Sequence, residues 1–374
     1  MKQIILVGIS PLVKRRVEVF YIEELRSKGF HFVHCDLSPC FFSNLHYENV
    51  IDVEYALTFE NIASFEEYLR SLEIVDTIFI VEVDHYDKYK AIFKLMKHYK
   101  CRCVKINPNA SDFVGYSLPF TQRYKLFGLK NVLSNLTLPF RNFCHHIIKG
   151  NIYNIYSDYI SSGNNPQIDI HINQQDWERA RFIGDSEPTI DYSYAVFCDE
   201  YFPDHPDFNY LDGFVTADEI KKKYRSELIA FFDYLEKKYS IRVVVAAHPK
   251  SNYLGNEFGN REIIRGNTME LVKNAEFTIV HGSMSISFSL IFNIPVILAI
   301  TDEMLNYSYY KWQSSIYSYY FSLPVYNLSN GVDDVCPKLI SPSIRNKYIY
   351  DFLTSPGLED KKNADILAEA FSRM

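Results

Sequence analysis

The chain has 374 residues, of which 47% are hydrophobic and 16% aromatic. This much apolar material supports a packed core and excludes a disordered chain, and the length favours two α/β domains over one. The formal net charge of −7, with acidic and basic residues interspersed, disfavours a general nucleic-acid-binding protein. The seven cysteines form no paired C-x-x-C set for zinc, so we expect free thiols in a reducing compartment.

Strand and helix patterns alternate through the first half of the chain. The opening stretch MKQIILVGIS is apolar over too few residues for a signal peptide or a membrane span, and predicts a first strand in a cytoplasmic protein. Apolar stripes predict helices at about 13–28, from a capping box of Ser64 and Glu67, and around 89–99. Further strands are expected at 30–35, 75–83 and 101–106. This order is typical of a parallel sheet covered on both faces.

The second half repeats the alternation. We expect a helix opened by a capping box of Thr216 and Glu219, shorter helices near 268–274 and 283–292, and strands at 194–198, 241–247, 277–280 and 295–300. The polar stretch 184–191 is the expected linker. The predicted domains are an α/β domain at 1–185, a second α/β domain at 186–345 and a helical segment at 346–374. The predicted fold class is α/β, with two Rossmann-like, doubly wound domains facing each other across a cleft.

One strand end carries a strong functional signal. Residues 243–250 read VVVAAHPK, so a buried apolar run stops at His248, Pro249 and Lys250. Ligands of open α/β sheets bind beyond the carboxyl ends of the strands, where these three residues would emerge. Pro249 cannot extend the strand, and Lys250 supplies a positive charge suited to phosphate. The alternative interpretation is an ordinary polar loop.

A second signal follows the strand that ends at Val280. The segment HGSMSISFS places small and hydroxyl residues at the start of an apolar helix, where free backbone N–H groups and the helix dipole favour an anion. We predict Ser283 as the N-cap and assign Ser283 and Ser285 to phosphate, and we interpret Ser287 and Ser289 as packing residues. Thr268, as a helix cap, and Glu270, as a ligand of a ribose hydroxyl, are further candidates for the donor site.

The third signal is acidic. Asp199 and Glu200 directly follow the strand 194–198, and a carboxylate there can take a proton from an attacking hydroxyl. We predict Glu200 as the base and Asp199 as its positioning partner, with one facing the cleft and the other turned toward the loop. The alternatives are a solvated acidic loop, or a metal site of Asp199, His205 and Asp207.

Several common motifs are missing. The sequence contains no G-x-G-x-x-G after the first strand, no Walker G-x-x-x-x-G-K-[ST] and no G-x-S-x-G elbow. A dinucleotide-binding oxidoreductase is therefore disfavoured.

The segments AAHPK, HGSMSISFS and IPVI together resemble the donor domain of GT-B-fold glycosyltransferases that build bacterial lipopolysaccharide and capsule. His248-Pro249 and Ser283/Ser285 are similar to the His-Pro and serine motifs of sialyltransferase-type enzymes that use CMP-sugars. Asp199-Glu200 is similar to their acidic motif, although Tyr201 replaces the glycine that commonly follows.

The resemblance implies transfer from a nucleotide sugar, with a CMP-sugar favoured, to a glycan or lipid-linked glycan. It also implies that 1–185 is the acceptor-side domain and 186–345 the nucleotide-sugar-binding domain. It implies no cofactor and no metal, because helix dipoles and basic side chains can meet the phosphate. It also implies a cytoplasmic protein, compatible with attachment at the periphery of the inner membrane. Two alternatives stay open: a polyol-phosphate transferase of the teichoic-acid type, and a catalytically inactive nucleotide-binding protein of the same fold.

Overall fold

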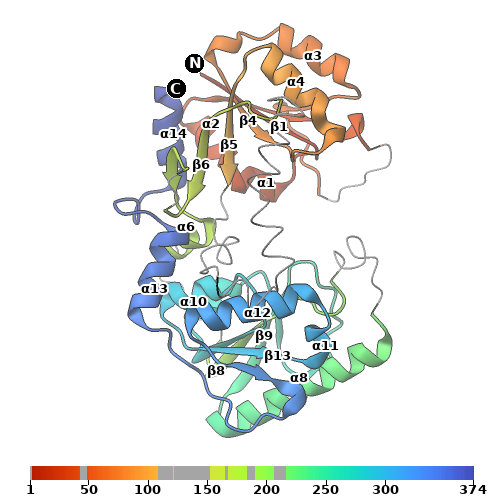
Figure 1. Ribbon diagram of the computed structural model, residues 1–374, viewed down its shortest axis with the longest axis vertical. Coiled ribbons are helices and arrows are strands. Elements are labelled where there is room, and N and C mark those ends of the chain that lie inside the picture. The colour runs from red at the N-terminus through yellow and green to blue at the C-terminus, as the bar shows by residue number, and fades with distance from the viewer. Residues whose placement is uncertain are drawn as a thin grey trace. The chain divides into compact units, whose positions relative to one another are not determined.

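The computed structural model describes residues 2–42, 49–107, 121, 152–164, 167–182, 190–205 and 216–374 (Figure 1). The chain divides into two compact units. Unit 1 contains the described residues up to Asn107, those of 152–178, and 350–374. Unit 2 contains residue 121 and the described residues of 179–349. The predicted helical segment 346–374 is not separate, because residues 350–374 belong to unit 1.

Unit 1 is built on a seven-stranded parallel sheet with the order β3-β2-β1-β4-β5-β6-β7. Its strands are β1 (Gln3–Gly8), β2 (His31–Asp36), β3 (Ala56–Thr58), β4 (Thr77–Glu82), β5 (Arg102–Asn107), β6 (Tyr156–Ser162) and β7 (Ile170–Ile172). Strand order reverses at β1, because β2 and β3 lie on one side of it and β4 to β7 on the other. In register, Gly8 at the end of β1 lies opposite Asp36 and Glu82.

Helices cover both faces of this sheet. They are α1 (Lys14–Val19), α2 (Ile22–Ser27), α3 (Ile62–Arg70), α4 (Lys90–His98), α6 (Gln175–Phe182) and α14 (Asn363–Arg373). Alternate residues of β1 point to opposite faces. Ile4 and Leu6 therefore join one apolar cluster, with residues of α2 and α14, while Ile5 and Val7 join another, with residues of α3 and α4.

Two predicted helix features of unit 1 are wrong in detail. The helix expected at 13–28 is broken into α1 and α2, because Tyr21 between them adopts a left-handed conformation with φ 52°. The capping box of Ser64 and Glu67 is not formed. Asn61 is the N-cap instead, and its side chain accepts a hydrogen bond from the Ser64 N–H at 2.9 Å.

Unit 2 is built on a six-stranded parallel sheet with the order β11-β9-β8-β12-β13-β14. Its strands are β8 (Tyr194–Cys198), β9 (Arg242–Ala247), β11 (Ile263–Arg265), β12 (Phe277–Val280), β13 (Val296–Ile300) and β14 (Val325–Asn327). A further short strand, β10 (Glu257–Asn260), lies outside this order. β8 pairs with β9 on one side and with β12 on the other, so the loops after these three strands are neighbours.

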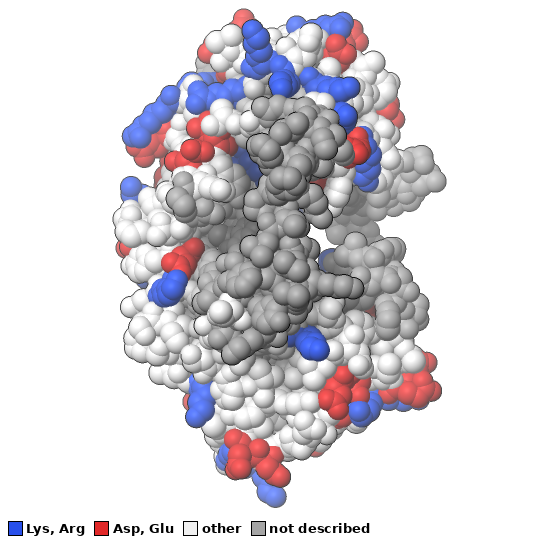
Figure 2. Space-filling model, in the orientation of Figure 1, with Lys and Arg blue, Asp and Glu red and all other residues white. Residues whose placement is uncertain are grey.

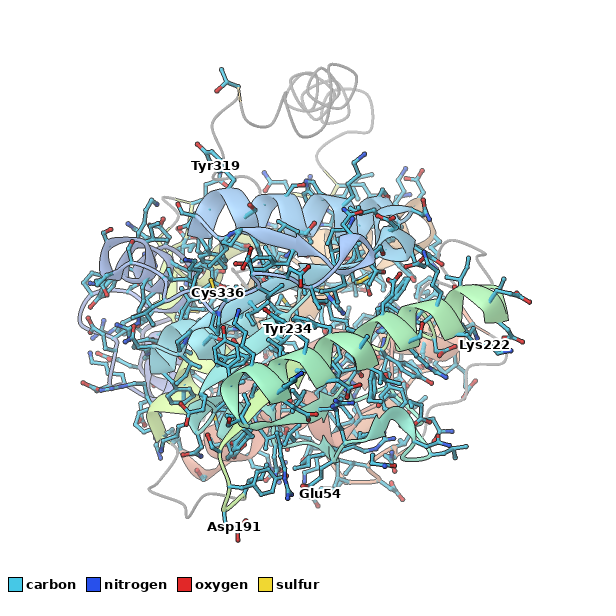
Figure 3. All side chains as sticks on the ribbon, turned by 90° about the horizontal axis from the view of Figure 1, so that it is seen from below. Glu54, Asp191, Lys222, Tyr234, Tyr319 and Cys336 are labelled. Atoms are coloured by element: carbon cyan, nitrogen blue, oxygen red, sulfur yellow. The ribbon has the colours of Figure 1, made fainter. Side chains whose placement is uncertain are left out.

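The helices of unit 2 are α8 (Asp218–Tyr239), α9 (Thr268–Lys273), α10 (Ile286–Phe292), α11 (Asp302–Leu305), α12 (Ser308–Phe321) and α13 (Pro342–Tyr348). The long α8 lies along one side of the sheet, and Figure 3 shows it with Lys222 near one end. Its buried face packs Leu228, Phe231 and Phe232 against Phe197 of β8 and Val245 of β9. The predicted capping box of Thr216 and Glu219 is wrong, because the N-cap is Ala217 and makes no side-chain cap bond.

Charge is unevenly spread over unit 1. Figure 2 shows Lys and Arg side chains gathered over the upper part of the drawn face, which belongs to this unit. The sequence from Lys88 to Lys105 contains no acidic residue. Among the described residues, no helix combines the length and the apolar character needed to cross a bilayer.

Candidate active site

The three predicted signals meet at the carboxyl edge of the unit 2 sheet. Asp199 and Glu200 follow the central strand β8, His248 follows β9, and Gly282 and Ser283 follow β12. Because β8 lies between the other two strands, the acidic pair sits between the His-Pro loop and the serine loop. The hydrogen bonds described next connect these loops directly.

Asp199 holds the loop after β9. Its side chain is 5% exposed. Oδ2 accepts hydrogen bonds from the His248 backbone N–H at 3.1 Å and from the Tyr253 hydroxyl at 2.9 Å. Oδ1 accepts one from the Tyr201 N–H at 2.9 Å. Burial raises the pKa of Asp199 to about 6, and these three bonds limit the rise by stabilising the carboxylate.

Glu200 turns the opposite way, toward the loop after β12. Its Oε1 accepts a hydrogen bond from the Gly282 backbone N–H at 2.7 Å. Burial raises the pKa of Glu200 to about 8, the Gly282 N–H counteracts the rise, and the charge of Asp199 adds to it. The two carboxylates thus bind loops on opposite sides of β8, and the expectation that one of them faces a cleft stays a prediction. The sequence carries no signal that each carboxylate binds a neighbouring loop.

Gly282 is required by close packing. A Cβ atom at this position would lie 2.7 Å from Cγ of Gln313 on α12, and 3.9 Å from Oε1 of Glu200. No side chain fits between the loop and α12 unless Gln313 moves. The Tyr317 hydroxyl on the same helix donates to the Ser283 carbonyl at 3.4 Å, so α12 supports the loop at two points.

The His-Pro loop forms a turn directly after β9. His248 Nδ1 accepts a hydrogen bond from the Lys250 N–H at 3.2 Å, and its carbonyl accepts from the Ser251 N–H at 2.9 Å. An acceptor Nδ1 leaves the ring proton of neutral His248 on Nε2, which is therefore a donor. The ring of His205 packs edge-on against it at 4.8 Å between centroids. Pro249 and Lys250 are exposed.

The serine loop differs from its prediction. α10 begins only at Ile286, so Ser285 is the N-cap residue, without a side-chain cap bond. Ser283 lies two residues earlier, and its Oγ accepts a hydrogen bond from the Ser285 N–H at 3.2 Å. The prediction that Ser283 is the N-cap is therefore wrong. Ser287 and Ser289 are packing residues as predicted, bonded to the hydroxyls of Tyr348 at 2.9 Å and Thr278 at 2.8 Å.

Thr268 and Glu270 lie on α9, which follows β11. Thr268 is the first residue of this helix, and the N-cap is Asn267, so prediction of Thr268 as the cap is wrong. Glu270 lies in the first turn. Its Oε2 is shielded from solvent and has no hydrogen-bond partner among the described residues.

A buried histidine supports the site without having been predicted. His281 is 0% exposed, and its Nδ1–H donates to the Ala299 carbonyl at 2.7 Å. The Tyr224 hydroxyl therefore donates to Nε2, at 2.9 Å. Burial lowers the pKa of His281 to about 4, so the ring stays neutral and ties the loop to β13 and α8. The sequence signal for this role was weak, because a lone histidine after an apolar strand has many uses.

The alternative metal site of Asp199, His205 and Asp207 includes a residue, Asp207, that lies outside the described part of the chain. Among the described residues, no group of three His, Cys, Asp or Glu side chains is placed to hold a metal ion.

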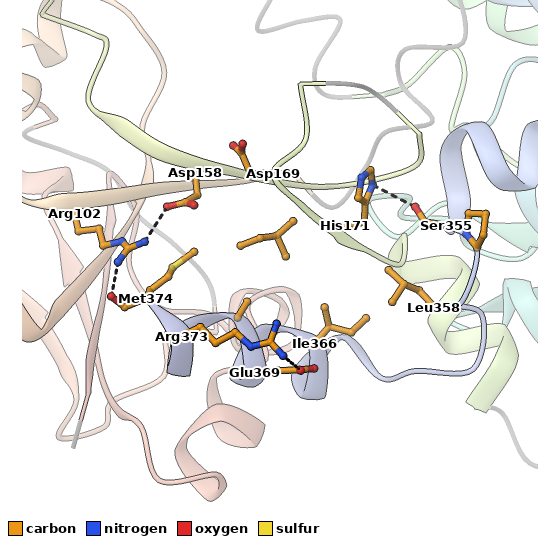
Figure 4. A pocket seen from close by; sticks show the side chains of 13 residues that line it. Arg102, Asp158, Asp169, His171, Ser355, Leu358, Ile366, Glu369, Arg373 and Met374 are labelled. Atoms are coloured by element: carbon orange, nitrogen blue, oxygen red, sulfur yellow. Dashed lines mark hydrogen bonds and ion pairs between the residues drawn. The ribbon is translucent and has the colours of Figure 1, made fainter.

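A separate cavity of about 580 Å³ lies in unit 1, between the β5–β7 edge of the sheet and α14 (Figure 4). Two ion pairs line it: Arg102 lies 3.6 Å from Asp158, and Arg373 pairs with Glu369. The carboxylate of Asp169, also in the lining, accepts a hydrogen bond from the Tyr159 N–H at 2.7 Å. None of the predicted site residues lines it.

No protein-family model matches the sequence, and no curated protein does. Among solved structures, the UDP-GlcNAc 2-epimerase of Methanocaldococcus jannaschii is similar with a TM-score of 0.50 and 11% identity, over 100% of both chains. The glycotransferase of kitacinnamycin has a TM-score of 0.47 and 12% identity, over 100% of this chain and 98% of its own. MurG of Acinetobacter baumannii has a TM-score of 0.43 and 7% identity, over 100% of both chains.

These identities are low, so the comparisons establish the fold alone. The match to the epimerase extends over the whole chain, and the two parallel sheets agree with it. The predicted fold class, α/β with two Rossmann-like units of the GT-B type, is confirmed.

Proposed function

We propose that the protein is a glycosyltransferase that moves a sugar from a nucleotide sugar, with a CMP-sugar favoured, to a glycan or lipid-linked glycan acceptor. The observation that carries the proposal is the hydrogen-bonded assembly of three strand-end loops, in which Asp199 binds the His248 N–H and Glu200 binds the Gly282 N–H. Fold-level analogy adds to it, because the similar epimerase is named for a UDP-sugar. Synthesis of a bacterial surface polysaccharide is the setting that the sequence resemblance favours.

In this proposal, the donor phosphate binds near His248, Pro249, Lys250, Ser283 and Ser285. His248 offers an Nε2–H donor, since its Nδ1 already accepts from the Lys250 N–H. Lys250 is exposed and supplies positive charge. Thr268 and Glu270 would contact the ribose, for which the shielded Oε2 of Glu270 is a suitable acceptor.

Glu200 would act as the general base, with Asp199 as the residue that positions the adjacent loop. A carboxylate with a pKa near 8 is a stronger base than an exposed one, and is ionised in half of the molecules at about pH 8. The backbone N–H groups of Gly282 and Ser283 fix the direction of the Glu200 carboxylate.

A second candidate is a nucleotide-binding protein without catalysis. It is favoured by one specific observation, which is that both carboxylates are buried and bonded to backbone N–H groups of the fold. Polyol-phosphate transfer would use the same phosphate site. We further propose that transfer needs no divalent metal, and that the protein can act at the periphery of a membrane that carries its acceptor.

The test begins with thermal stabilisation by CMP, CDP, UDP and GDP, measured on the full chain. Stabilisation by CMP above the others supports a CMP-sugar donor, and the corresponding sugar nucleotides can then be assayed for release of the nucleotide. Stabilisation by none of the four contradicts nucleotide binding. Binding of CMP without turnover of CMP-sugars, in the presence of glycan acceptors, favours the second candidate or polyol-phosphate transfer.

A further inference from the structure

The carboxyl edge of the unit 1 sheet contains a second place suited to a ligand. Strand order reverses at β1, and in open α/β sheets such a reversal leaves room for a ligand outside the strand ends. Gly8 ends β1 there, and Glu82, which ends β4, lies opposite it. None of the residues at this edge is used in the site of unit 2.

Gly8 allows two polar side chains to approach the strand end. A Cβ atom on Gly8 would lie 3.0 Å from Nη1 of Arg16 and 3.8 Å from Nε2 of His34. Gly8 is not among the glycines with positive φ, so the backbone conformation does not require glycine here. A larger residue at position 8 would instead push against the Arg16 guanidinium, which lies beside the His34 ring.

His34 is buried without hydrogen bonds. Its side chain is 0% exposed, and neither ring nitrogen has a partner among the described residues. Burial, aided by the charge of Arg16, lowers the pKa of His34 to about 3, so the ring is neutral and carries one donor and one acceptor. Buried polar groups are nearly always paired. The comparable histidine of unit 2, His281, has partners for both of its nitrogens.

The charged groups around His34 cancel each other. Nη2 of Arg16 lies 2.6 Å from Oε2 of Glu82, and Nη1 donates to the Ser10 carbonyl at 3.0 Å. The Arg16 side chain is 13% exposed and that of Glu82 is 40% exposed, so the pair lies at the border between His34 and solvent. An anionic ligand would have to compete with Glu82 for Arg16. A neutral ligand with several hydroxyl groups can accept from Arg16, donate to Glu82 and do both with His34.

We propose that Gly8, Arg16, His34 and Glu82 form a binding site for a neutral, hydroxyl-rich ligand, the sugar ring of a glycan acceptor. The inference rests on the proposed function, because only glycosyl transfer requires such an acceptor. A ligand hydroxyl binds His34 Nε2 when the Arg16 guanidinium moves away from Gly8 while keeping its bond to Glu82. His34 and Arg16 are specificity residues here, and the proposal assigns them no part in proton transfer.

The experiment uses the full chain labelled with ¹⁵N-histidine and records the ring signals of its histidines. The His34→Leu variant identifies the His34 signals by their loss. The probes are the methyl glycosides of glucose, galactose and N-acetylglucosamine at millimolar concentration, without donor, and CMP in a parallel titration. We expect at least one glycoside to shift the His34 signals and CMP to leave them unchanged. If none of the three glycosides shifts them, the proposal is overturned.

Two glycine variants provide a matched control. Gly8→Ala places a Cβ against Arg16, and we expect it to weaken glycoside binding at least tenfold with CMP binding unchanged. Gly282→Ala places a Cβ against Gln313 in unit 2, and we expect it to weaken CMP binding only. Absence of CMP binding by the wild type would contradict the CMP-sugar donor, and absence of binding of all four nucleotides would contradict the proposed function; neither result would contradict the glycoside site. Unchanged glycoside binding in Gly8→Ala would contradict the glycoside site alone.

Stability separates a ligand role of His34 from a purely structural one. Leucine matches the size of the ring and removes two buried nitrogens that have no partner in the fold, so His34→Leu should unfold at the same temperature as the wild type or higher. Weakened glycoside binding with retained stability supports the proposal. A marked drop in unfolding temperature would show that the fold itself uses the nitrogens, and would overturn it.

Discussion

Glu200→Gln should stabilise the protein increasingly as pH rises. Glutamine resembles the protonated form of Glu200 and keeps an oxygen that can accept the Gly282 N–H. Burial raises the pKa of Glu200 from an ordinary 4.5 to about 8. The folded state therefore holds this proton more tightly than the unfolded state does. The stability that this tighter binding supplies is fully present below pH 4.5, and is lost as pH rises through about 8.

The size of the effect follows from the same two values. Each pKa unit corresponds to about 1.4 kcal/mol, so the full rise is equivalent to about 5 kcal/mol. Most of this loss of stability occurs between pH 5.5 and pH 8.5, where the linkage relation gives a decrease of about 3 kcal/mol in the free energy of unfolding. This is a large share of the 5–15 kcal/mol that is typical of a folded domain.

Urea denaturation of the wild type and of Glu200→Gln at pH 5.5, 7.0 and 8.5 would measure the difference. Glu219→Gln is the matched control, because Glu219 is exposed on α8 and the same chemical change should have no comparable effect there. The advantage of Glu200→Gln should grow by about 3 kcal/mol across this range. A difference that stays constant with pH would refute the assignment of a buried carboxylate with a raised pKa.

Four further outcomes are expected. His248→Ala should weaken CMP binding, measured by calorimetry, by ~1–3 kcal/mol, because a hydrogen bond to a charged phosphate is lost. Unchanged affinity in a folded variant would show that His248 does not bind the donor. Glu200→Gln should lower turnover by ~10²–10⁴-fold with little change in CMP affinity. Wild-type turnover should rise with pH through about 8, as Glu200 ionises. Near-normal turnover in both Glu200→Gln and Asp199→Asn would mean that the base lies in unit 1. Tyr253→Phe should cost about 1 kcal/mol of stability, since one hydrogen bond to Asp199 is lost, and thermal unfolding would show it. EDTA should leave transfer intact, whereas full loss of activity that Mg²⁺ or Mn²⁺ restores would contradict a metal-independent mechanism.

The strands and their polar ends could be predicted from the sequence, because apolar, β-branched runs such as VVVAA stop abruptly at polar residues. Helix starts were harder. Ser64 and Thr268 fit capping patterns, yet Asn61 and Asn267 are the caps, because several residue types near a helix start can take this role.

The contacts within the site could not be predicted from the sequence. The bond from Gly282 to Glu200 depends on β8 lying between β9 and β12, and strand order is not encoded locally. The need for glycine at 282 comes from Gln313, which is 31 residues away in the chain. His34 gave no signal either, because a single polar residue within an apolar strand does not reveal whether it has partners.

The return of the chain into unit 1 has a consequence for the order of folding. Ala364, Leu367 and Phe371 of α14 complete the apolar cluster around Ile4 and Phe32, and Lys2 donates hydrogen bonds to the carbonyls of Phe371 and Ser372. These contacts join segments more than 300 residues apart, so they form late during synthesis, whereas every strand of the unit 2 sheet has been made by Asn327. Unit 2 can therefore close its core first. Until the last residues of α14 emerge, one apolar face of unit 1 is covered only in part, by α2 among others, and during that interval unit 1 depends most on protection from aggregation.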